Sequence, residues 1–172
     1  MNISQDKYSL WIIPTYDDLN YLDHYISHIA NETKTKIYTP HCTLIGGING
    51  LPDKDKIEKI IHHFDSPIVI RAKSVNVSAI FWKSIYIQLV CSDNLCQLQS
   101  EIHRGLFPEN PYIFDPHISL AYLNKHINNK AHLARKIGVK STFEFNRIQL
   151  MKTGDDVDKW EKIFEVRIGE TK

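Results

Sequence analysis

A short phrase occurs twice in this chain: residues 40–44 read Pro-His-Cys-Thr-Leu and residues 116–120 read Pro-His-Ile-Ser-Leu. Both copies fit the pattern Pro-His-x-[Ser/Thr]-Leu. A pattern that fixes most of its positions is rare by chance, and a matched pair in one chain is rarer. The repeat constrains the fold, because the two copies should share one local structure and meet in space.

Each copy has the pattern expected of a β-strand with one polar and one apolar face. Side chains at positions i and i+2 of a strand point to the same face. His41 and Thr43 therefore share a face, and His117 and Ser119 do likewise. The residues between and after them are apolar and can anchor each strand in a core. If the two strands lie side by side, two imidazoles and two hydroxyls line one cleft.

These four side chains suit acid–base chemistry at a phosphate ester. An imidazole has an unperturbed pKa near 6.5, so one ring can be neutral while another is protonated. The neutral ring can accept a proton from water, and the protonated ring can donate one to the departing sugar oxygen. Hydroxyls can donate hydrogen bonds to the non-bridging phosphate oxygens. We therefore predict a phosphodiesterase with His41 and His117 as catalytic residues and Thr43 and Ser119 as phosphate-binding residues, without metal or other cofactor.

The overall charge favours a small substrate. The chain has 21 basic and 20 acidic residues and a formal net charge of +1. A protein that grips long nucleic acid usually carries a clustered basic stripe. We therefore expect a small cyclic nucleotide as substrate and no stable binding of long nucleic acid. Neither motif carries an Asp or Glu at ligand spacing, which argues against a metallohydrolase.

Length and cysteine content limit the domain number and the compartment. A chain of 172 residues, 42% hydrophobic, supports one domain with a real core. The cysteines Cys42, Cys91 and Cys96 form no zinc-like spacing, and their odd number favours a reducing compartment. The N-terminus has no apolar segment of a secretory signal, and no stretch is long enough to span a bilayer. We expect a cytoplasmic monomer with no membrane association.

Local patterns predict a mixture of helices and strands. We expect Thr15, Asp53 and Ser92 to cap helices, with Asp18 at the capping-box position after Thr15. The expected strands cover about 8–14, 41–45, 68–79, 80–90, 117–122, 142–152 and 160–168, and the expected helices about 17–32, 53–63, 93–106 and 128–137. Each half of the chain has a motif strand followed by a helix.

The motif pair resembles the signature of the 2H phosphoesterase superfamily, a doubled H-x-[ST]-x. Within it, the chain is most similar to the cyclic phosphodiesterases of the plant and yeast type. The phrases that carry this second resemblance are Tyr-Ser-Leu-Trp-Ile-Ile-Pro at 8–14, Ser-Leu-Ala-Tyr at 119–122, and Met-Lys-Thr at 151–153 before an acidic turn and Trp160. The resemblance covers nearly the whole chain.

The resemblance implies an α+β fold, in which residues 1–172 form one domain of two interleaved lobes. The lobes are related by a pseudo-twofold axis, and two antiparallel sheets flank a central groove with helices outside. It implies hydrolysis of ADP-ribose 1″,2″-cyclic phosphate and of nucleoside 2′,3′-cyclic phosphates to 2′-phosphates. Trp11 and Tyr122 become candidate walls for the nucleoside, although strict alternation turns Tyr122 away from the cleft unless the strand ends near Ala121. Which histidine is the base stays open, with a preference for His117.

Two alternatives remain from the sequence. One is a phosphodiesterase of the same superfamily that processes RNA ends or degrades oligonucleotide second messengers. The other is a nucleotide-binding module without catalytic activity. The aromatic residues Phe81, Trp82 and Trp160 are expected in packing rather than in substrate contacts.

Overall fold

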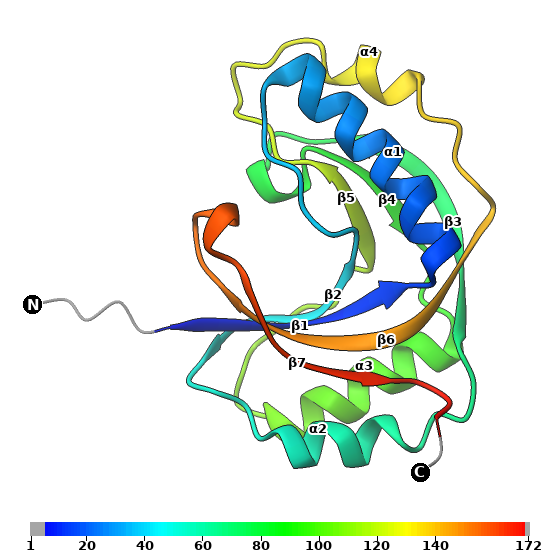
Figure 1. Cartoon of the computed structure of the whole chain (residues 1–172), viewed down its shortest axis with the longest axis vertical. Coiled ribbons are helices and arrows are strands. Elements are labelled where there is room, and N and C mark those ends of the chain that lie inside the picture. The colour runs from blue at the N-terminus through cyan, green and yellow to red at the C-terminus, as the bar shows by residue number, and fades with distance from the viewer. Residues whose placement is uncertain (1–5, 171–172) are drawn as a thin grey trace, which may run out of the picture.

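The computed structural model describes residues 6–170, which form a curved antiparallel sheet with helices on its outer sides (Figure 1). The strands are β1 Lys7–Pro14, β2 Cys42–Asn49, β3 Ile68–Val77, β4 Ile85–Leu89, β5 His117–Ala121, β6 Thr142–Thr153 and β7 Glu161–Arg167. The α-helices are α1 Tyr16–Thr33, α2 Lys54–Ile61, α3 Asp93–Leu106 and α4 Lys130–Arg135, and two short 3₁₀ turns are η1 Phe81–Lys83 and η2 Val157–Lys159. The expected mixed α and antiparallel β class is confirmed.

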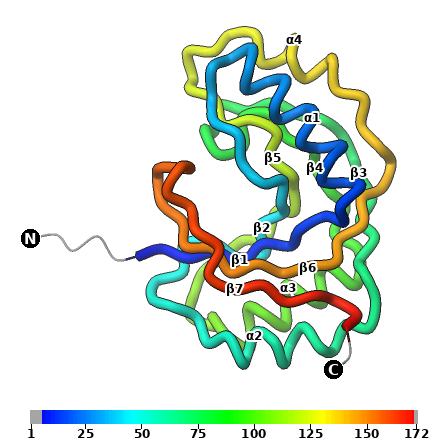
Figure 2. Tube along the Cα trace, viewed as in Figure 1, coloured from blue at the N-terminus to red at the C-terminus, as the bar shows by residue number. Residues whose placement is uncertain are grey.

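The seven strands join in one sheet, with the order β1-β2-β5-β4-β3-β6-β7 and a further pairing of β1 with β6. Residues 142–145 of β6 pair with β3, and residues 145–153 pair with β1, which lies between β6 and β2 (Figure 2). The two sheets expected from the family resemblance are thus continuous, because the long strand β6 belongs to both halves.

The helices cover the sheet where the sequence patterns place their apolar faces. Helices α1 and α4 contact β5 and β3, and helices α3 and α2 contact β2 and β7 on the opposite side of the molecule (Figure 1). Helix α3 has its expected bounds, and Ser92 caps it by accepting a hydrogen bond from the Leu95 N–H. Its residues Leu98 and Ile102 are fully buried. A capped, amphipathic helix therefore forms as predicted.

Helix α1 begins after Thr15 as expected, but its first turn is not a capping box. The Thr15 side chain makes no capping hydrogen bond. The Asp18 carboxylate instead accepts a hydrogen bond from the Glu144 N–H at 2.7 Å and pairs with Lys140. Asp18 thus ties α1 to β6, because β6 runs close to the first turn of the helix.

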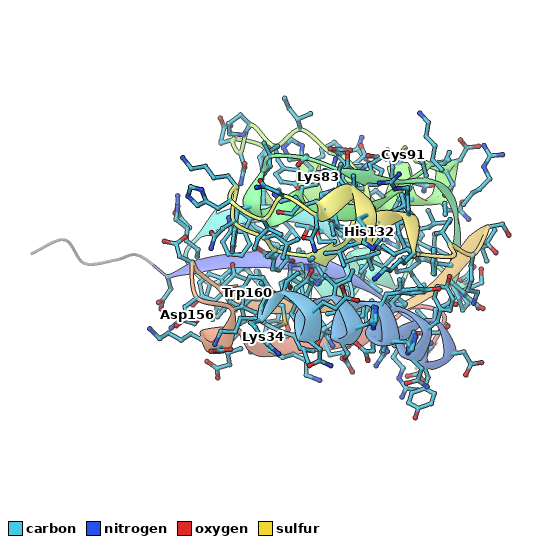
Figure 3. All side chains as sticks on the ribbon, turned by 90° about the horizontal axis from the view of Figure 1, so that it is seen from above. Lys34, Lys83, Cys91, His132, Asp156 and Trp160 are labelled. Carbon is cyan, nitrogen blue, oxygen red and sulfur yellow. A yellow bond between two sulfur atoms is a disulfide. The ribbon has the colours of Figure 1, made fainter. Side chains whose placement is uncertain are left out.

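The structure pairs two cysteines that the sequence analysis did not pair. A disulfide joins Cys91, just after β4, to Cys96 in the first turns of α3, and Figure 3 marks Cys91. The chain reverses direction between these elements and brings the two Cα atoms within 5.7 Å. Cys42 is a buried free thiol. Within residues 6–170, no helix has the length and apolar character that crossing a membrane requires.

Candidate active site

A cavity of about 440 Å³ opens on the inner side of the curved sheet. Its lining includes all four motif residues, namely His41, Thr43, His117 and Ser119. The other lining residues are Lys7, Ser9, Trp11, Gly46, Gly47, Trp82, Tyr112, Tyr122, Thr153, Gly154, Asp155 and Trp160. The structure therefore brings together the six site residues that the sequence analysis named.

The pairing of β2 with β5 brings the two motifs together. The strands are antiparallel, and Cys42 lies opposite Ile118. Both of these side chains are fully buried in the core. The antiparallel register therefore places each histidine across from the hydroxyl residue of the other motif. The x position anchors each motif, while its histidine and hydroxyl face the cavity.

Both imidazoles are oriented in the same way by the backbone. The Nδ1 atom of His41 lies 2.6 Å from the carbonyl oxygen of Thr39, and the Nδ1 atom of His117 lies 2.7 Å from that of Asp115. A carbonyl oxygen only accepts, so each ring donates its Nδ1–H and carries its lone pair on Nε2. In each motif the accepting carbonyl precedes the proline, which has no N–H and favours an extended residue before it. The Pro-His pair thus orients the ring.

Trp11 supports His41. The two rings stack with their centroids 3.6 Å apart and their planes 7° apart. Trp11 is 3% exposed and lines the cavity from β1. One face of Trp11 is therefore occupied by the candidate catalytic ring, which restrains both side chains.

Tyr122 lies in the cavity wall because β5 ends at Ala121. Beyond the last strand residue the alternation no longer applies, and the side chain turns to the same side as those of His117 and Ser119. The ring of Tyr38 stacks on Tyr122 with a centroid distance of 4.0 Å and an interplanar angle of 12°.

Burial keeps both histidines neutral in the ligand-free protein. Burial lowers the pKa of His41 to about 4, while the hydrogen bond to Thr39 opposes this shift. Burial also lowers the pKa of His117, against the hydrogen bond to the Asp115 carbonyl. Taking a cation out of water favours the neutral imidazole. Near neutral pH both Nε2 atoms are therefore proton acceptors.

The two hydroxyls differ in their present partners. The Ser119 hydroxyl donates a hydrogen bond to the Trp82 carbonyl oxygen at 2.8 Å. To donate to a bound anion, it has to leave this carbonyl. Thr43 lines the cavity from β2, half-buried.

Several cavity residues were not found from the sequence. Trp82 and Trp160, expected in packing, line the cavity, as do Lys7 and Ser9. Lys7 and Ser9 alternate with Trp11 along β1, so the two-residue period of that strand could have predicted that they share its face. Trp82 and Trp160 lie in and beside turns, where no such period exists. In the part of the chain that the structure describes, no group of three or more His, Cys, Asp or Glu side chains could hold a metal ion.

The fold is similar to that of several solved structures, one of which is described as a phosphoesterase, although no protein-family model and no curated protein sequence matches this chain. E. coli LigT in its apo form superposes with a TM-score of 0.64 at 10% identity, over 97% of this chain and 99% of that chain. E. coli LigT complexed with 3′-AMP gives a TM-score of 0.61 at 9% identity, over 97% of this chain and 100% of that chain. TT0787 of Thermus thermophilus gives 0.61 at 10% identity, over 95% of this chain and 98% of that chain. The chain therefore has the same fold as these three structures.

Proposed function

We propose that this protein is a metal-independent phosphodiesterase that hydrolyses small cyclic phosphates. The observation that carries the proposal is the arrangement of His41 and His117, which line one cavity with their Nδ1 atoms fixed to backbone carbonyls. The substrates are nucleoside 2′,3′-cyclic phosphates, opened to 2′-phosphates, and ADP-ribose 1″,2″-cyclic phosphate. The fold it shares with E. coli LigT, which has been solved with 3′-AMP and with NADP+, supports a nucleotide ligand.

The proposed reaction is an in-line attack of water on phosphorus. One neutral imidazole accepts a proton from water at Nε2, and the water oxygen bonds to phosphorus. The bond from phosphorus to the sugar 3′ oxygen breaks, and the second imidazole, protonated, gives its Nε2 proton to that oxygen. Thr43 and Ser119 donate hydrogen bonds to the non-bridging oxygens, where negative charge gathers. The two rings finish with their protonation states exchanged.

We assign the base to His41 and the acid to His117, the reverse of the preference stated from the sequence. An anionic substrate raises the pKa of both rings, since it favours their cationic forms. His41 is 6% exposed and its pKa starts at about 4, so it stays neutral more easily. His117 is only half-buried, so burial opposes its protonated form less than it does for His41.

The cavity supports a small substrate over a long one. A volume of about 440 Å³ lies in the range of small-molecule sites. Lys7 and Asp155 contribute one charge of each sign to its wall. Such a wall is not a basic track along a phosphate backbone.

The experiment is hydrolysis by purified protein in EDTA, with products resolved by phosphorus NMR. The substrates are ADP-ribose 1″,2″-cyclic phosphate and the four nucleoside 2′,3′-cyclic phosphates. We expect 2′-phosphates from the nucleotides, and loss of turnover in His41→Ala and His117→Ala. His24→Ala, a change on the exposed side of α1, is the matched control and should keep full activity.

Three outcomes would overturn the proposal. Activity that survives either site variant removes that histidine from the mechanism. Turnover only of a short RNA with a 2′,3′-cyclic end favours the RNA-processing alternative. Tight nucleotide binding without any product favours a binding module.

A further inference from the structure

Two tryptophans from opposite halves of the molecule line the cavity close to each other. Trp82 lies in η1, the short green turn beside β5, and Trp160 follows η2, the orange turn at the β6–β7 hairpin (Figure 1). Their ring centroids are 5.9 Å apart, and their planes differ by only 31°. Trp82 is 38% exposed and Trp160 is half-buried, and both line the cavity.

Tyr122 closes one side of this pair. Its ring is nearly perpendicular to Trp82, at 75° and 5.1 Å, and to Trp160, at 68° and 6.0 Å. The three rings therefore form a box with two roughly parallel walls and one crosswise wall.

In two other aromatic pairs of this region, the two ring faces are in stacking contact with each other. Trp11 lies flat on His41, and Tyr38 lies flat on Tyr122. The Trp82–Trp160 pair differs, because its rings are tilted by 31° and neither lies flat on the other. Carbon atoms in contact lie about 3.5–4.0 Å apart, so a flat ligand between two rings needs about 7 Å between their faces. An indole would have to turn to admit one.

We propose that Trp82 and Trp160 form a clamp for the nucleobase, which inserts between their faces with one edge toward Tyr122. This inference rests on the proposed function and deepens it: the clamp selects substrates that carry a planar base beside the cyclic phosphate. Stacking accepts every base, because each has a π face. The clamp therefore predicts tolerance among the four bases and discrimination against substrates without a base.

Both walls are held by the backbone. The Trp160 Nε1–H donates a hydrogen bond to the Gly154 carbonyl oxygen at 2.9 Å. Asp156, in the same hairpin, lies nearer the edge of the molecule than Trp160 does (Figure 3). The η1 turn is fixed by Ser84, whose hydroxyl donates to the Leu123 carbonyl at 2.9 Å and accepts from the Leu123 N–H at 3.0 Å. Rotation of the Trp82 indole, rather than movement of the two turns, would supply the widening.

The experiment compares two substrates in the unmodified protein and in variants of the two tryptophans. The substrates are adenosine 2′,3′-cyclic phosphate and methyl riboside 2′,3′-cyclic phosphate, which lacks the base. Trp82→Ala and Trp160→Ala should raise KM for the nucleotide by about 5- to 150-fold, the worth of one base–aromatic stack. KM for the base-free compound should not change. Trp82→Ala keeps the backbone carbonyl that Ser119 contacts, so kcat for the base-free compound tests the catalytic residues separately.

Tyr16→Leu is the control, because Tyr16 is an exposed aromatic residue at the start of α1 that does not line the cavity. It should leave both KM values near those of the unmodified protein. Trp82→Phe and Trp160→Phe retain a smaller stacking face and should restore part of the loss. Thermal unfolding of each variant identifies any that is misfolded. If an alanine variant is misfolded, the phenylalanine variant at the same position tests the clamp in its place.

Equal effects of the tryptophan variants on both substrates, or no effect on either, would overturn the clamp while leaving the proposed function intact. If the unmodified protein turns over neither substrate, the proposed function fails. Calorimetric binding of adenosine 2′-monophosphate then tests the clamp alone. Weaker binding in Trp82→Ala and Trp160→Ala, with Tyr16→Leu unchanged, supports the clamp, and absent or unaltered binding overturns it.

Discussion

The Nδ1 atom of His117 lies 2.7 Å from the carbonyl oxygen of Asp115, whose carboxylate is itself anchored to β4. The Gln88 amide donates from Nε2 to the Asp115 carboxylate at 2.9 Å and to the Pro116 carbonyl at 2.8 Å. Lys83 pairs with the same carboxylate. The Asp115 side chain thus holds the backbone segment that orients His117.

This anchoring predicts a loss of kcat when the Asp115 side chain is removed. Asp115→Ala should lower kcat by about 10- to 100-fold with little change in KM, because a small displacement of a catalytic group is costly while the cavity stays intact. Asp115→Asn should lose less, since an amide oxygen can still accept from Gln88. Steady-state kinetics of the two variants check this order. A rise in KM with unchanged kcat would assign Asp115 to substrate binding instead.

The same ion pair predicts opposite pH shifts in two variants. The Asp115 carboxylate raises the pKa of His117, and Lys83 lowers it. If His117 is the acid, activity falls as pH rises through its pKa. Asp115→Asn should therefore move the alkaline limb of the kcat profile to lower pH, and Lys83→Met should move it to higher pH. Shifts of both variants in the same direction would contradict this assignment.

The acidic limb of the kcat/KM profile should belong to His41. This profile reports the free protein, in which the pKa of His41 is about 4. A base acts only when neutral, so activity should persist down to about pH 4 and fall below it. Measurements between about pH 3.5 and 9, with circular dichroism to verify folding, test this. A limb near the ordinary histidine value would mean that His41 is not the base.

The strand pattern predicted much of the site because it depends on local geometry. Two-residue alternation placed His41, Thr43, His117 and Ser119 on the inner faces of two strands, and pairing of Cys42 with Ile118 brings these faces together. Helix α3 was predicted to the residue, because a capping serine and a buried apolar stripe mark it.

The remaining features depend on contacts between distant segments or on irregular backbone. Trp82 and Trp160 meet only because η1 and the β6–β7 hairpin face each other, and neither turn has a periodic signal. The Cys91–Cys96 disulfide depends on how β4 passes into α3. The role of Asp18 depends on where β6 passes α1. Sequence spacing contains none of these relations.

A substrate with sulfur in place of the 3′ bridging oxygen should separate the acid from the base. A thiolate is a far weaker base than an alkoxide and can depart without a proton. His117→Ala should therefore hydrolyse the 2′,3′-cyclic analogue almost as fast as the unmodified protein, while His41→Ala should remain inactive. The unsubstituted nucleotide, on which both variants are inactive, is the control. Rescue of His41→Ala instead would reverse the two roles.

Ser84 should be a stability determinant that also supports the tryptophan clamp. Its side chain is fully buried, and its hydroxyl satisfies both the N–H and the carbonyl of Leu123. Ser84→Ala leaves the Leu123 N–H unpaired in the interior and should lower the free energy of unfolding by about 1–3 kcal/mol. Because η1 then loses its attachment next to Tyr122, KM for adenosine 2′,3′-cyclic phosphate should rise as well. Denaturant unfolding measures the first effect and steady-state kinetics the second.

Ser100→Ala, an exposed change on α3, is the control and should alter neither the free energy of unfolding nor KM. A destabilised Ser84→Ala with unchanged KM would show that the clamp does not depend on this attachment.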